Sequence, residues 1–161
     1  MAGQRVLADS SKPCRRRRLP CDGGGMDDAT NLTVHPIHLG LGASAEIEPE
    51  FTGGMDWYMA YGDRHDATDG LESRLVSMHT FTEPWDSWEM HPSGHEVVLC
   101  TSGTMTLHQE HADGSPATVV LGPGEYVINP PGTWHTADVD ADAEATGVFI
   151  TAGTGTEIRP R

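Results

Sequence analysis

The sequence has few positive charges, and most of them lie near its N-terminus. Of its 161 residues, ten are Lys or Arg and 24 are Asp or Glu. Six of the ten cations fall within residues 1–25, including the block at 15–18. Because only Asp9 and Asp22 lie in that segment, the remaining residues carry 22 carboxylates, four arginines and no lysine. Such a balance excludes nucleic acids and anionic membrane surfaces as partners.

Long apolar runs and paired cysteines are also missing. No stretch of about 18 consecutive apolar residues is present, and the N-terminus lacks the apolar segment of a secretory signal, so we predict a cytoplasmic protein without a membrane span. The three cysteines, Cys14, Cys21 and Cys100, form no CxxC pair and are too few for a disulfide framework. Cys100 is expected to be a buried thiol.

The length of the chain is typical of one domain with its own core. Residues 1–25 show no periodicity and end in three glycines, which predicts a disordered leader or a segment upstream of a true start at Met26. A nucleic-acid arm and an export signal are the alternatives for this segment. The rest of the chain is expected to divide into an N-terminal arm with a strand at about 57–61 (residues 26–69), the main domain (70–152) and a C-terminal tail (153–161).

The main domain is predicted to consist of short β-strands. Segments rich in β-branched residues alternate there with turn signals that contain Gly and Pro. No segment has a convincing amphipathic-helix pattern. The chain is therefore predicted to be all-β, a sandwich or barrel, for which the jelly roll is one arrangement. The predicted strands cover residues 74–81, 96–101, 104–110, 117–122, 125–129 and 145–152.

Several side chains suited to metal binding lie between these strands. Glu89 and His91 are two residues apart, so they share one face of an extended chain. Glu96 follows closely, and His95 beside it would point the opposite way on a regular strand. His135 follows a turn, and by itself it would more often be an ordinary half-buried histidine than a metal ligand. Whether these side chains meet depends on the fold.

The order and spacing of these residues resemble two motifs of the cupin superfamily. The second cupin motif is G-x5-P-x-G-x2-H-x3-N. It is matched by Gly124, Pro130, Gly132 and His135, with Val139 in place of the asparagine.

The first cupin motif is G-x5-H-x-H-x3,4-E-x6-G, and here the match is less complete. His91, Glu96 and Gly103 fit it, whereas Glu89 takes the place of the first histidine and Glu83 that of the first glycine. The resemblance covers about residues 70–152 and implies a cupin-type jelly-roll β-barrel.

The resemblance also implies a metal site that both motifs build. Carried over position by position, His91, Glu96 and His135 are the expected ligands, Glu89 is a fourth oxygen ligand, and His95 is a reserve ligand. Imidazole and carboxylate ligands suit one divalent transition metal, Fe, Mn, Ni, Cu or Zn, without choosing among them. Two alternatives stay open: Glu89 as a solvated rim carboxylate, and a cupin that has lost its metal.

A metal held by three or four protein ligands has open coordination positions, and catalysis needs such positions. The favoured hypothesis is a metal-dependent enzyme acting on a small organic molecule, as a dioxygenase or a lyase or isomerase, with Glu89 as general base if it is not a ligand. The alternative is a non-catalytic small-molecule-binding or sensor protein. A sugar-nucleotide epimerase is disfavoured, since the main domain has few cations to grip a pyrophosphate.

Nearness to the motifs suggests which residues line the pocket. Trp88, Trp134, Tyr126 and Met105 are candidate walls, although Met105 and Tyr126 are favoured as core. Arg74 is the candidate for binding a substrate carboxylate, with a surface position as the alternative. The resemblance further implies a homodimer, for which the apolar segment 55–61 would be an interface strand.

Overall fold

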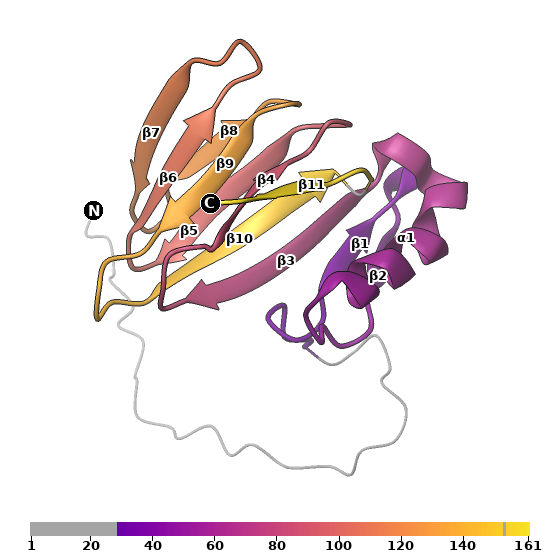
Figure 1. Cartoon of the computed structure of the whole chain (residues 1–161). Helices are drawn as coiled ribbons and strands as arrows, with labels where there is room; N and C mark the ends of the chain where they lie inside the picture. The colour runs from indigo at the N-terminus through magenta and orange to yellow at the C-terminus, as the bar shows by residue number, and fades with distance from the viewer. Residues whose placement is uncertain (1–28, 153) are drawn as a thin grey trace, which may run out of the picture.

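The computed structural model describes residues 29–152 and 154–161, which form two antiparallel β-sheets and one α-helix (Figure 1). The leader predicted at residues 1–25 lies outside the described residues. The six-stranded sheet contains, in spatial order, β2 (Ala45–Ile47), β1 (Ile37–Leu39), β3 (Arg74–Phe81), β10 (Ala145–Ala152), β5 (Glu96–Ser102) and β8 (Tyr126–Asn129). The five-stranded sheet contains β11 (Glu157–Pro160), β4 (Ser87–Met90), β9 (Trp134–Asp138), β6 (Met105–Glu110) and β7 (Pro116–Leu121).

The predicted all-β jelly-roll fold is confirmed. β3 and β10 have the predicted bounds, and the segment between the two motifs forms the β6–β7 hairpin. In the described part of the chain, the strands pair as two separate sheets and not as one closed barrel. The site therefore lies where two sheets face each other.

The core between the sheets follows the period-2 pattern of the strands. β5, β6 and β10 bury alternate residues, as expected for strands with one face toward a core. Met105 and Cys100 are fully buried in the main cluster, and Cys100 is a free thiol, as predicted. Gly103 closes β5 at a φ of 72°, and a Cβ there would lie 2.0 Å from the Glu144 carbonyl oxygen. Only glycine fits this turn.

The N-terminal arm contains a helix where a strand was expected. Helix α1 (Met55–Asp69) replaces the strand predicted at 57–61, so the predicted interface strand is also wrong. Trp57, Tyr61 and His65 are its buried residues, one every four positions, which is helical spacing. Two of their rings pack in a small cluster with Leu75. In Figure 1, α1 lies with β1 and β2 at one side of the molecule, away from the β6–β7 hairpin.

The segment expected to be a C-terminal tail contains strand β11. This strand pairs antiparallel with β4 and places Ile158 opposite Glu89. The pairing makes β11 the edge of the five-stranded sheet, beside the first motif. Among the described residues, the helical structure offers no segment with the length and apolar character of a membrane span.

Candidate metal centre and cavity

The two sheets bring the four predicted ligands together. Glu89 on β4 pairs in register with His135 on β9, and His91 directly follows β4. Ligand atoms of these three residues lie within 4.8 Å of one another. Glu96 comes from β5 of the other sheet, with its oxygens 3.3 Å from His91 Nε2 and 2.8 Å from His135 Nε2. We call these four residues the ligand cluster.

Two nitrogens of the ligand cluster are buried without a hydrogen-bond partner. Nε2 of His91 and Nε2 of His135 lie close to Glu96, but the angles at these contacts are not those of hydrogen bonds. A buried polar atom without a partner is rare, because burial removes it from water at a cost. Two imidazole nitrogens beside a carboxylate form a donor set that fits a divalent transition metal.

The other ring nitrogens are held by residues outside the cluster. His135 Nδ1 donates to the Thr133 carbonyl oxygen at 3.3 Å, which leaves the lone pair on Nε2. His91 Nδ1 lies 3.0 Å from the Thr156 hydroxyl oxygen, just before β11. Metal-binding histidines commonly have their second nitrogen fixed in this way. The bonds orient both rings with Nε2 toward Glu96.

A hydrogen-bond chain positions the Glu96 carboxylate. Thr151 donates to Oε1 at 2.9 Å and Asn129 Nδ2 donates to Oε2 at 3.1 Å. Gln109 Nε2 in turn donates to Asn129 Oδ1 at 2.6 Å. The strand register explains this series of hydrogen bonds, because Asn129 pairs with Glu96 and Gln109 pairs with His135. The two motifs do not indicate these supporting residues, although Asn129 directly precedes the proline of the second motif.

The ligand cluster also shifts the protonation of its members. Burial alone would raise the pKa of Glu96, but the contacts with His135 and His91 outweigh it and hold the pKa well below its ordinary value. Burial disfavours the charged His135 ring, yet Glu96 raises its pKa. Burial and then the charge of Glu96 raise the pKa of Glu89. One carboxyl of the cluster is thus strongly ionised and the other holds its proton more tightly.

A cavity of about 860 Å³ opens on the ligand cluster and is lined by Glu89, His91 and Glu96. Helix α1 and the loop before it supply another wall, which includes Tyr58. Burial, and then the charges of Glu89 and Glu96, raise the pKa of Tyr58 to about 12, so its hydroxyl remains a proton donor at neutral pH. This wall comes from the arm and could not be recognised from the motifs.

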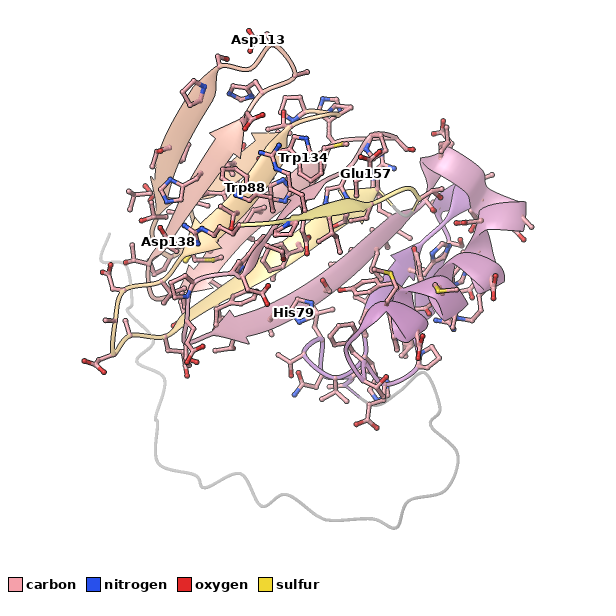
Figure 2. The ribbon with its side chains drawn as sticks, viewed as in Figure 1. His79, Trp88, Asp113, Trp134, Asp138 and Glu157 are labelled. Carbon is pink, nitrogen blue, oxygen red and sulfur yellow. The ribbon has the colours of Figure 1, made fainter. Side chains whose placement is uncertain are left out.

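None of the four candidate wall residues lines this cavity, and neither does Arg74. Trp88 and Trp134, both labelled in Figure 2, contact Arg159 instead, because its guanidinium carbon lies over their rings at 5.2 and 4.4 Å from the centroids. Arg159 also forms an ion pair with Glu110. These tryptophans therefore hold a surface arginine.

The remaining predicted site residues also lie elsewhere. Tyr126 is 62% exposed, so it belongs neither to the cavity nor to the core, whereas Met105 is fully buried in the core. The Arg74 guanidinium donates to the backbone carbonyls of Leu71 and Ser73 and binds no carboxylate there. His95 is exposed, as strand alternation predicts, and stays outside the ligand cluster.

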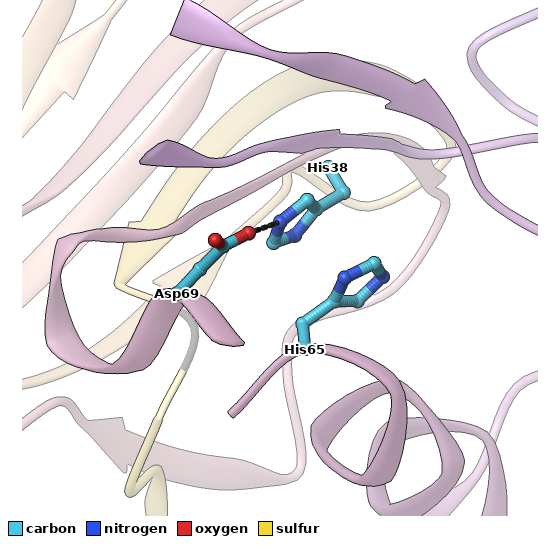
Figure 3. Close-up of side chains that lie close together, drawn as sticks. All are labelled: His38, His65 and Asp69. Atoms are coloured by element: carbon cyan, nitrogen blue, oxygen red, sulfur yellow. Dashed lines mark hydrogen bonds and ion pairs between the residues drawn. The ribbon is translucent and has the colours of Figure 1, made fainter. Parts of the chain in front are cut away.

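A second group of histidines and carboxylates lies in the arm. His38 and His65 are buried and stack with ring centroids 3.5 Å apart and an angle of 10° between the ring planes (Figure 3). His38 Nε2 donates to Asp69 at 2.7 Å, and the Tyr61 hydroxyl lies 2.8 Å from His38 Nδ1. His65 Nε2 donates to Glu48. We call His38, His65 and Asp69 the anchor cluster, because it ties helix α1 to β1.

The anchor cluster does not fit a metal ion, although three of its donor atoms lie within 4.8 Å of one another. The lone pair of an imidazole nitrogen lies in the plane of its ring. Nearly parallel rings separated by 3.5 Å cannot both direct a lone pair at one ion. The rings of His91 and His135 are 5.5 Å apart and inclined by 38°, which removes that obstacle.

The chain is similar to several solved structures, three of which follow. Peruvianin-I, described as a cysteine peptidase from Thevetia peruviana latex, is 20% identical with a TM-score of 0.47, over 54% of this chain and 56% of its own. A hydroquinone 1,2-dioxygenase from Sphingomonas sp. TTNP3 is 13% identical with a TM-score of 0.41, over 48% and 58%. A Klebsiella pneumoniae protein with a double-stranded β-helix domain is 20% identical with a TM-score of 0.46, over 55% and 76%.

This chain thus covers little more than half of the first two of these proteins. At such low identities and TM-scores, nothing about activity follows from the similarity. No curated protein matches the sequence. Residues 80–151 match the family model of the cupin domain, and this region contains both motifs and the whole ligand cluster. This match, together with the two-sheet fold, identifies residues 80–151 as a cupin domain.

Proposed function

We propose that this protein is a metal-dependent enzyme that acts on a small organic molecule in the cavity beside the ligand cluster. One observation carries the proposal: the Nε2 atoms of His91 and His135 are buried, have no hydrogen-bond partner, and both lie next to Glu96 at the wall of the cavity. The cavity volume of about 860 Å³ falls within the usual range for small-molecule sites.

His91, Glu96 and His135 would hold the metal through two imidazoles and one carboxylate. Such a metal with open positions supplies a Lewis acid that polarises a bound oxygen group. Thr133, Thr156 and the Asn129 amide keep these side chains in place through their hydrogen bonds. The site is therefore positioned before any substrate enters.

Glu89 would transfer the proton in the reaction. Its carboxyl lines the cavity and lies among the ligands, within reach of a bound molecule. A carboxyl that is buried beside another negative charge is suited to general acid and base work near neutral pH. Dioxygenation and lyase or isomerase chemistry are both compatible with a metal and one carboxyl group in these positions.

Element analysis of the purified protein, with matched variants, tests the proposal. We expect about one transition metal per chain in the wild type, and its loss in His135→Ala. His95→Ala, an exposed neighbour of the cluster, is the control and should keep the metal. Glu89→Gln should keep most of the metal but lose turnover in a substrate screen. A metal-free wild type, or one in which metal removal leaves turnover unchanged, would overturn the proposal. A protein that keeps its metal but shows no turnover would point to a non-catalytic binding role.

A further inference from the structure

Among the residues that the structure describes, no arginine or lysine lines the cavity. Among the described residues the cations are four arginines, and each is engaged elsewhere. Arg64 pairs with Glu48, Arg161 pairs with Asp138, and Arg159 pairs with Glu110 and lies over the rings of two tryptophans. Arg74 is bound to backbone carbonyls. A negatively charged molecule in the cavity would find no arginine or lysine counterion in the described part of the chain.

The cavity is instead lined by carboxylates. Six of them face it, two within the ligand cluster and four nearer to solvent: Asp63, Asp66, Glu83, Asp86, Glu89 and Glu96. These carboxylates would repel a negatively charged molecule inside the cavity, and the repulsion is stronger where burial excludes water. The lining therefore favours an uncharged or positively charged occupant over an anion.

A continuous series of aromatic rings leads along the cavity to the ligand cluster. Ring centroids are 4.9 Å apart between Phe51 and His79, 5.9 Å between His79 and Phe149, and 5.8 Å between Phe149 and Trp85. Trp85 then lies 6.1 Å from the ring of His135. These spacings are those of packed aromatic pairs, and the first four rings line the cavity. The wall suits a flat aromatic molecule that ends near the ligand cluster.

His79 does not supply the missing positive charge. Burial lowers the pKa of its ring, so His79 is uncharged at neutral pH and contributes an aromatic face to the wall. The Tyr58 ring, 5.7 Å from Phe51, adds a further face and a hydroxyl group. Near the aromatic wall, the polar groups of the cavity are therefore hydrogen-bonding groups without positive charge.

We infer that the cavity binds a phenolic ring whose side chain is uncharged or positively charged, and that it discriminates against carboxylates and phosphates. The ring would pack on the aromatic wall, with an oxygen substituent directed to the ligand cluster. This inference rests on the proposed function for its orientation, because the oxygen is placed where the metal would be. The preference in charge rests on the four carboxylates of the lining that lie outside the ligand cluster, Asp63, Asp66, Glu83 and Asp86.

Three probes that share one ring test the inference: tyramine, tyrosol and 4-hydroxyphenylacetate, with side chains that are positive, neutral and negative. Calorimetric titration of the full protein, as purified and with its metal quantified, should show tyramine and tyrosol binding about tenfold or more tightly than 4-hydroxyphenylacetate. Equal or tighter binding of 4-hydroxyphenylacetate, or no binding of any of the three, overturns the inference.

Two substitutions examine the aromatic wall directly. Phe51→Leu should weaken tyrosol binding by about fivefold or more, because it removes a ring face at the cavity. Tyr126→Leu is the matched control, an exposed aromatic residue outside the cavity, and should leave binding unchanged. Equal affinities for wild type and Phe51→Leu contradict the aromatic wall.

A titration after chelation separates this inference from the proposed function. If the protein never holds a metal but still prefers tyramine and tyrosol, the proposed enzyme is wrong and the charge preference stands. If the metal is present and the anion binds best, the metal site stands and the inference about the ligand fails.

Discussion

The ligand cluster and the anchor cluster contain the same kinds of side chain but differ in their hydrogen bonding. In the anchor cluster both nitrogens of His38 have partners, Tyr61 and Asp69. In the ligand cluster, Nε2 of His91 and of His135 have none, although both are buried. The anchor rings are stacked, whereas the ligand rings are inclined.

This contrast shows that composition and proximity alone do not make a metal site. Three donor atoms lie within 4.8 Å of one another in both clusters. The anchor cluster uses its donors to fasten α1 to β1, and none of its fully buried side-chain nitrogens and oxygens lacks a hydrogen-bond partner. The ligand cluster leaves two buried ring nitrogens without a hydrogen-bond partner, a state that a metal ion relieves.

The largest expected difference between the two clusters is in metal affinity. His91→Ala should lower the affinity for Zn²⁺ or Mn²⁺ by more than about 100-fold, since loss of an outer hydrogen bond alone costs about 10–100-fold. His65→Ala should leave the affinity unchanged. Competition titrations of both variants against a metal indicator measure this. Equal losses in the two variants would show that the clusters do not differ in this way.

A smaller loss of metal affinity is expected from the residues that hold Glu96. Asn129→Ala removes the amide that donates to Glu96 Oε2 at 3.1 Å, and metal affinity should fall about 10–100-fold. Gln109→Ala, one bond further away, should have a weaker effect in the same direction. The same titration measures both variants, and thermal unfolding controls for loss of fold. An unchanged affinity in Asn129→Ala would show that Glu96 needs no such support.

The anchor cluster should affect stability without affecting the metal. Tyr61→Phe removes the hydroxyl that bonds His38 Nδ1 at 2.8 Å, which should lower the free energy of unfolding by about 1 kcal/mol. Metal content should stay at the wild-type value. Urea unfolding monitored by circular dichroism, with element analysis of the same sample, gives both quantities. Loss of metal in this variant would contradict a purely structural anchor.

The smallest expected effect is the dependence of stability on pH through Asp69. The hydrogen bond from His38 lowers the pKa of this carboxyl, so it binds protons less readily in the folded protein than in the unfolded chain. Its contribution is fully present above the ordinary Asp pKa of about 4 and is lost as the pH falls through the lowered value. The difference in Tm between wild type and Asp69→Asn should therefore shrink from pH 7 to pH 3. A difference in Tm that is constant over this pH range would show that Asp69 does not contribute to the loss of stability in acid.

The sequence predicted six of the eleven strands in the described part of the chain and the proximity of the four candidate ligands, because both depend on local patterns. Alternation placed Glu89 and His91 on one face, and motif spacing indicated that His135 lies opposite. The same alternation explains why the pocket prediction failed. Trp88 precedes Glu89 and Trp134 precedes His135, so each tryptophan points away from its neighbour and out of the cavity. Nearness along a strand is the wrong criterion for a shared pocket.

The helix and the cavity wall were beyond prediction from the motifs. Trp57, Tyr61 and His65 had helical spacing, but one of them is a histidine and the aromatic residues around them also suit a strand. Phe51 and Tyr58 reach the cavity from the arm, with no motif to indicate it. Such contacts between distant segments depend on tertiary packing and leave no local pattern in the sequence.

The region after β10 does more than pair as a strand, because its Thr156 orients a histidine of the ligand cluster. The Thr156 hydroxyl lies 3.0 Å from His91 Nδ1, and Gly155 and Thr156 also border the cavity. A histidine of the first motif is thus oriented by a residue 65 positions later in the chain. Trimming the protein at the boundary of the matched family region would therefore keep both motifs and yet leave one imidazole free to turn.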